Sequence, residues 1–101
     1  MKKHWLVICV ILGACSKPDP RLQEAENHIR AALKDGDSAR IKNLRVIEKH
    51  GVQDGVVCAE VNGKNSYGGY EGYKTTSYNP NGDHVNIDND GNDSTLKDIC
   101  S

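Results

Sequence analysis

The alternation of apolar and polar positions predicts a helix over residues 20–34. Its apolar face, with the helical spacing of an amphipathic segment, consists of Leu22, Ala25, Ile29, Ala32 and Leu33. Asp19 suits the N-cap, and Pro20 suits the first helical position, where a missing amide hydrogen costs nothing. Residues 34–36 (Lys-Asp-Gly) stop the pattern. We expect a second, short helical turn after them, capped by Asp37 or Ser38 and running through Lys42.

The rest of the chain has a pattern typical of strands. Residues 56–62 form the strongest candidate, because they begin with β-branched and apolar side chains. Weaker candidates are residues 44–48, residues 66–78 as one strand or a bent pair, and residues 84–87. Segments rich in Gly and Asn separate them, at residues 51–55, 63–65 and 79–82. Helix first and antiparallel strands afterwards predict a small α+β domain with an N-terminal helix packed on the sheet.

The N-terminus has the layout of a secretory signal. Lys2 and Lys3 precede an apolar run over residues 5–12, and small residues follow it. Residues 12–15 (Leu-Gly-Ala-Cys) resemble the lipobox of bacterial lipoproteins, which implies cleavage before Cys15 and a lipid on its thiol. An ordinary signal peptide is one alternative. An uncleaved anchor is the other, and eight apolar residues are too few to span a bilayer as a helix.

The expected organisation is therefore a signal peptide over residues 1–14, a lipidated tether over residues 15–19 and one domain over residues 20–101. Several acyl chains on Cys15 anchor a protein stably, whereas one chain is marginal. Ser16 follows the cysteine, and similarity to lipoproteins without aspartate at that position implies the outer membrane. We thus expect an exported protein, held by its lipid at the periplasmic face of the outer membrane.

Composition limits both the core and the partners of the mature chain. Without Lys2 and Lys3 it has 11 Lys and Arg against 14 Asp and Glu, a balance that argues against nucleic-acid binding. Its Leu, Ile and Val number only fifteen, and Phe is absent. A domain with so small a core usually needs a covalent cross-link, such as a disulfide, to be stable. Cys58 and Cys100 are the cysteines left after processing and lipidation, and a disulfide between them would contribute about 4 kcal/mol.

Three segments carry a resemblance to a family. Residues 33–39 read Leu-Lys-Asp-Gly-Asp-Ser-Ala, residues 57–65 read Val-Cys-Ala-Glu-Val-Asn-Gly-Lys-Asn, and residues 66–73 read Ser-Tyr-Gly-Gly-Tyr-Glu-Gly-Tyr. They are similar to small exported proteins of bacterial and phage genomes with a Val-Cys-Gly-x-Val-Asn-x-Lys-Asn strand. Gly36 and Ala59 depart from the proline and glycine of that pattern. The resemblance implies a secreted α+β domain whose central cysteine is in a disulfide, and it implies no activity.

The polar segment after the strongest strand is the candidate binding site. It comprises Asn62, Lys64, Asn65, Tyr67, Tyr70 and Tyr73. The lysine could meet a carboxylate or phosphate, and the tyrosines could form a contact face. The alternative is structural: the asparagines would hydrogen-bond the turn backbone, and the tyrosines would supply the missing aromatic core. We favour the structural interpretation, with at least two tyrosines buried.

Other candidate chemistry is weak. Residues 86–93, including Asp88 and Asp93, match the front half of a calcium-binding EF-hand loop, but Lys97 stands where its glutamate belongs. A solvated turn is the preferred interpretation. The histidines show no paired spacing for zinc, so neither a metal nor another cofactor is expected. A triad of Cys58, His84 and an aspartate lacks any catalytic signature.

These observations favour a non-enzymatic lipoprotein of the cell envelope. Its domain would bind an envelope protein or peptidoglycan, while the lipid on Cys15 would bind the membrane. One alternative, suggested by the phage and prophage occurrence of the similar family, is an exclusion or conversion lipoprotein that blocks a surface receptor. The other is a periplasmic hydrolase that uses Cys58 as its nucleophile.

Overall fold

The structure is a computed structural model that describes residues 19–101. The expected signal peptide (residues 1–14), the lipidation site Cys15 and residues 16–18 of the tether lie outside the described residues. Within the described part, no helix has both the length and the apolar character needed to cross a bilayer.

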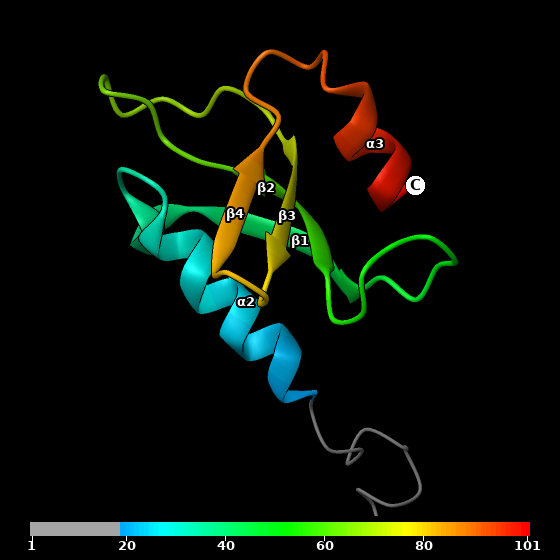
Figure 1. Cartoon of the computed structure of the whole chain (residues 1–101). Helices are drawn as coiled ribbons and strands as arrows, with labels where there is room; N and C mark the ends of the chain where they lie inside the picture. The colour runs from blue at the N-terminus through cyan, green and yellow to red at the C-terminus, as the bar shows by residue number, and fades with distance from the viewer. Residues whose placement is uncertain (1–18) are drawn as a thin grey trace, which may run out of the picture.

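The domain is α+β, as expected from the sequence (Figure 1). Its sheet has four antiparallel strands in the order β1-β2-β3-β4, so that neighbours along the chain are neighbours in space. The strands are β1 (Arg40–Val46), β2 (Val57–Asn62), β3 (Lys74–Asn79) and β4 (His84–Ile87). The helices are α2 (Pro20–Ala31), the short 3-10 turn η1 (Gly36–Ser38) and α3 (Ser94–Cys100).

Helix α2 covers one face of the sheet. The Asp19 side chain caps it by accepting a hydrogen bond from the Arg21 amide, and Pro20 occupies its first turn, as predicted. Ala25 and Ile29 are fully buried beneath it. They pack in the main core with Val57, Ala59, Val61 and Tyr78 of β2 and β3. Because alternate residues of a strand point to opposite faces, this set defines the face that α2 covers.

Helix α2 ends at Ala31, three residues earlier than predicted. The Arg30 guanidinium donates hydrogen bonds to the carbonyl oxygens of Gly36 (2.6 Å) and Ala39 (2.9 Å), which folds the following segment back against the helix. A Cβ atom at Gly36 would lie 2.0 Å from the Arg30 carbonyl oxygen, so this close approach requires glycine. The contact of the Arg30 side chain with Gly36, six residues further along the chain, therefore ends the helix.

The predicted helical turn through Lys42 is wrong beyond Ser38. Only residues 36–38 are helical; Ala39 is extended, and β1 begins at Arg40, four residues before the predicted strand. Ala39 and Ile41 are two residues apart, which is the spacing of one strand face and not of one helix face, and Ile41 packs against the main core opposite Val61. The register of β1 shifts between Lys42 and Arg45, where Asn43 has a positive φ of 57°.

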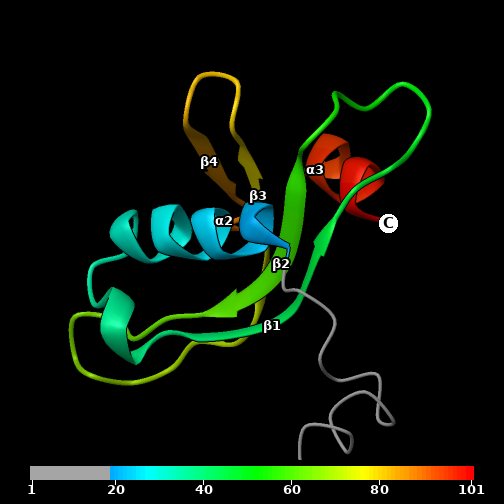
Figure 2. The same cartoon turned by 90° about the horizontal axis from the view of Figure 1, so that it is seen from below.

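Helix α3 covers part of the opposite face. Residues 94–100 form a helix capped by the Asp93 side chain, which accepts from the Leu96 amide at 2.9 Å. The disulfide between Cys58 and Cys100 joins this helix to β2, as predicted. Figure 2 shows the two helices apart from each other on either side of β2. A second, smaller core surrounds the disulfide, formed by Ile47, Val56 and Leu96.

Candidate functional site

The segment between β2 and β3, residues 63–73, is a loop rather than the predicted first half of a strand; we call it the tyrosine loop. One isolated antiparallel β-bridge pairs Lys64 with Tyr70 across the loop. Gly68 and Gly72 have φ values of 83° and 108°, a backbone region that favours glycine and interrupts a regular strand. The loop lies against the end of α2, where the Lys34 Nζ donates to the Ser66 hydroxyl at 3.1 Å.

The candidate asparagines have the structural role that we favoured. Asn62 is buried, and its side-chain oxygen accepts from the Gly72 amide at 3.0 Å. The Asn65 side-chain oxygen accepts from the amides of Tyr67 (2.9 Å) and Gly69 (3.0 Å). The Asn65 side-chain nitrogen also donates to Glu71, which, together with Lys74, lowers the pKa of that carboxyl below its usual value. These hydrogen bonds hold the loop in one conformation.

The expectation that at least two tyrosines are buried is wrong. Tyr78 alone among the four is buried, while Tyr70 is half-buried, Tyr73 is 43% exposed and Tyr67 is 96% exposed. The core does not need them, because aliphatic side chains from β2 and α2 fill the space around Tyr78. Tyr67 thus projects a large aromatic ring into solvent with no packing role in the domain.

Cations lie over the other two loop tyrosines. The Arg40 guanidinium is 4.1 Å from the centre of the Tyr70 ring, and the Lys64 ammonium is 5.7 Å from it. The Lys42 ammonium lies 4.1 Å from the Tyr73 ring. The Tyr70 hydroxyl donates to the Ser38 carbonyl oxygen at 2.8 Å and so fixes the ring. Cations from β1 and from the loop itself therefore lie over these two rings.

A groove of about 330 Å³ lies between the tyrosine loop, the end of α2 and the edge of the sheet. Three lysines line it, Lys34, Lys64 and Lys74, and we call it the lysine groove. Apolar side chains, including Leu33, Val61 and Ile87, form the rest of its wall. Glu71 is its one acidic lining residue, and it already forms an ion pair with Lys74 at 3.4 Å. This arrangement can hold a small anionic group beside an apolar one.

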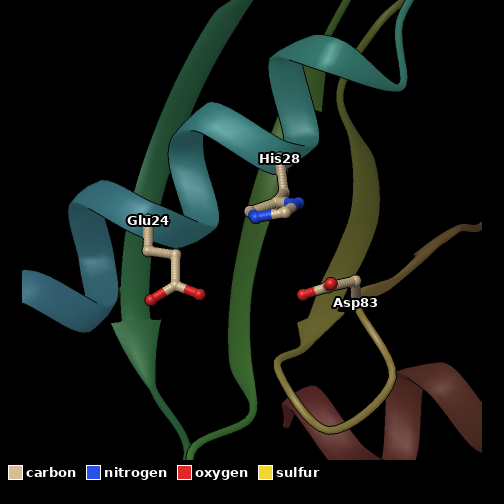
Figure 3. Close-up of side chains that lie close together, drawn as sticks. All are labelled: Glu24, His28 and Asp83. Carbon is tan, nitrogen blue, oxygen red and sulfur yellow. The ribbon is translucent and has the colours of Figure 1, made fainter.

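A second polar cluster lies along the middle of α2. Glu24 and His28, one helical turn apart, meet Asp83 from the turn between β3 and β4 (Figure 3), and their ligand-type atoms all lie within 4.8 Å of one another. The Tyr78 hydroxyl donates to Asp83 at 2.9 Å and is 3.3 Å from Glu24. His28 stacks on the Tyr78 ring with centroids 4.6 Å apart. Burial and the bond to Asp83 raise the pKa of Tyr78 far above its usual value.

The sequence pattern did not predict this cluster, because His28 has no histidine or cysteine at the spacing of a zinc site. The i, i+4 spacing of Glu24 and His28 on a predicted helix was an available signal, because such residues share one helix face. Asp83 could not have been added from the sequence, because its position depends on how the β3–β4 turn packs against α2.

The structure does not assemble the calcium-binding loop or the catalytic triad that the sequence suggested. In the segment of residues 86–93, the Asp88 carboxylate is buried and accepts from the Asp93 amide at 3.2 Å, while Asp90 accepts from the Asn92 amide. These carboxylate oxygens accept hydrogen bonds from backbone amides of the same turn. Cys58 is in the disulfide, so the triad with His84 has no thiol, and the His84 ring instead contacts Asn86 at 2.9 Å.

Comparison with known protein families, curated proteins and solved structures finds no match to this chain. The family resemblance of residues 33–73 therefore stays an expectation from the sequence. The function has to be argued from the lysine groove and the tyrosine loop themselves.

Proposed function

We propose that this protein is a non-enzymatic lipoprotein of the bacterial envelope whose domain binds peptidoglycan through the lysine groove. The observation that carries the proposal is the gathering of Lys34, Lys64 and Lys74 around a partly apolar hollow. Ser66 lines this hollow, and the exposed Tyr67 follows it in the chain. Free carboxylates of peptide stems are the anionic groups of peptidoglycan, and its sugar rings present faces on which an aromatic ring stacks. The groove supplies the first chemistry through its lysines, and the loop that lines part of it supplies the second through Tyr67.

The charge balance of the groove supports an anionic ligand. The Glu71 carboxylate already accepts a hydrogen bond from Asn65 and forms an ion pair with Lys74. Among residues 19–101, Lys34 and Lys64 take part in no ion pair. A ligand carboxylate would meet two ammonium groups that have no carboxylate partner of their own, and charge-assisted hydrogen bonds of this kind are the stronger class. This local positive charge is unexpected in a chain with more acidic than basic residues.

The exposure of Tyr67 also supports a binding role. A tyrosine that is 96% exposed contributes little to the core, yet tyrosine offers a large contact area at low entropic cost. The loop that carries it is held by Asn62, Asn65 and Tyr70. A preorganised loop loses little conformational freedom when its ligand binds.

Sedimentation with purified peptidoglycan sacculi tests this proposal. The full chain with Cys15→Ser, which carries no lipid, should sediment with sacculi at low salt and less so at high salt, because exposed charges are screened. Lys34→Ala combined with Lys64→Ala should weaken binding at least about tenfold, the effect of losing roughly 1.4 kcal/mol. Lys49→Ala, which lies outside the groove, is the matched control.

Two results would count against the proposal. One is sedimentation of the double variant with the same affinity as the control. The other is stronger binding to anionic phosphatidylglycerol vesicles than to sacculi, which would make the groove a site for lipid phosphate.

Anchoring is a separate part of the proposal and rests on the lipobox-like residues 12–15. We expect the cellular protein to fractionate with membranes and to begin at an acylated Cys15. Mass spectrometry of the N-terminal peptide measures this directly. A mature chain that starts elsewhere and carries no lipid would overturn the anchoring while leaving the groove untouched.

A further inference from the structure

We propose that Glu24, His28 and Asp83 form a binding site for a divalent transition-metal ion of the zinc class. The site shares no residue with the lysine groove, which is lined by the residues that follow α2. It would have three protein ligands, two from α2 and one from the β3–β4 turn, and would leave one coordination position for water. The bound ion would tie the helix to the edge hairpin of the sheet.

The three side chains converge on one place. Figure 3 shows that Glu24 and His28 project from the same side of α2 toward the turn, while the Asp83 carboxylate projects back toward them. Their ligand atoms lie within 4.8 Å of one another. A tetrahedral zinc ion with bonds of about 2.1 Å needs ligand atoms about 3.4 Å apart. Glu24 and Asp83 are exposed and can close this difference by side-chain rotation.

The charges at the cluster are suited to a cation. Two carboxylates share the hydroxyl of Tyr78, which has one proton and can donate it to only one of them at a time. Within the described part of the chain, neither Glu24 nor Asp83 pairs with a lysine or arginine. Like charges this close are unfavourable, and a divalent ion between them would remove the repulsion.

The ligand set distinguishes between metals. An imidazole nitrogen with two carboxylates suits zinc and its neighbours, whereas calcium and magnesium prefer oxygen ligands alone. Tyr78 has the position of an outer-shell group: its ring stacks on His28 and its hydroxyl bonds Asp83. Such groups orient the ligands without touching the ion.

Cobalt and zinc titrations of the full chain test the site, after the thiols of Cys9 and Cys15 have been alkylated so that they cannot bind metal. We expect one equivalent of Co²⁺ to give visible absorption bands, zinc to displace it, and zinc to raise the melting temperature by several degrees. Asp83→Asn and His28→Gln should each weaken binding at least about tenfold. Asn tolerates the positive φ of 50° at position 83, so Asp83→Asn leaves the turn unstrained.

Two further variants separate a metal site from a simple hydrogen-bonded contact. Tyr78→Phe should keep stoichiometric cobalt binding, because the hydroxyl is not a ligand. His50→Gln, at a histidine outside the cluster, should behave as the original chain. The proposal is overturned if cobalt binds without a defined stoichiometry, if His50→Gln abolishes binding, or if zinc raises the melting temperature of Asp83→Asn as much as that of the original chain.

Discussion

The two helices on opposite faces of the sheet are attached by different means. Helix α2 has 12 residues and is held by noncovalent contacts, with Ala25 and Ile29 fully buried against β2 and β3. Helix α3 has seven residues and buries Leu96 and Cys100, and the disulfide joins it to β2. A helix of two turns cannot bury enough apolar surface to repay the entropy of ordering it. The covalent bond therefore replaces the packing that α3 lacks.

Side-chain hydrogen bonds reach both helices. The Arg30 and Tyr78 side chains connect α2 to its neighbours. Arg45 donates to the Cys100 carbonyl oxygen of α3, and Lys49 donates to the Asp98 carbonyl oxygen at 2.6 Å. The two faces therefore differ in the disulfide and in apolar packing, and substitutions can separate these two interactions.

The largest effect is expected from removing the disulfide. Cys58→Ser combined with Cys100→Ser should lower the free energy of unfolding by about 4 kcal/mol, because the bond closes a segment of 42 residues. Urea denaturation measures the loss. Hydrogen exchange should show a larger loss of protection in α3 than in α2. Equal loss of protection in both helices would contradict the separation of the two faces.

Ile29→Ala tests the face that depends on packing. It removes a fully buried side chain from the main core and should cost about 3 kcal/mol, through lost burial and the cavity that remains. The disulfide should still form, as a non-reducing mass measurement would show. Ile29→Val is the matched control, at about 1 kcal/mol. A cost below that of the valine variant would mean that α2 is not the main support of its face.

Loss of the cap should matter most for the shorter helix. Asp93→Ala removes the side chain that accepts from the Leu96 amide and should cost about 1 kcal/mol, with fraying confined to α3. Asp93→Asn keeps a good cap and should be close to neutral. Asp19→Ala should fray only the first turn of α2 and change global stability less. Amide exchange rates of the two helices measure both effects.

Tyr67→Ala lies outside both helix faces and should have the smallest effect on stability, within about 0.5 kcal/mol, because the ring is exposed. The same variant should weaken binding to sacculi. If it lowered the melting temperature strongly, the ring would have a packing role and the binding proposal would lose one of its two supports.

Local signals in the sequence were sufficient for several elements. Asp19 and Pro20 marked the start of α2, the β-branched run marked β2, and the Asn-Pro-Asn-Gly turn separated β3 from β4. The disulfide followed from the number of cysteines left in the mature chain. In the candidate site, the backbone role of Asn62 and Asn65 was also predictable, because asparagine in a turn usually bonds nearby amides.

The remaining features depend on contacts and packing that no sequence pattern marks. Helix α2 ends where Arg30 binds Gly36, and this contact has no local signature. Helix α3 has few apolar residues, so its periodicity was too weak to distinguish it from a tail. Tyrosine burial was misjudged because the need for an aromatic core was inferred from composition, whereas one ring, Tyr78, was enough. The cluster at His28 depends on Asp83, which is far away in the sequence.

The length of α2 determines how the domain would stand on a membrane. The chain enters α2 at Pro20, and the tyrosine loop contacts the opposite end through Lys34 and Ser66. Twelve residues at 1.5 Å each make a spacer of about 18 Å. In the proposed lipoprotein, the lipid would precede α2, and the helix would place up to about 18 Å between the start of the domain and the lysine groove.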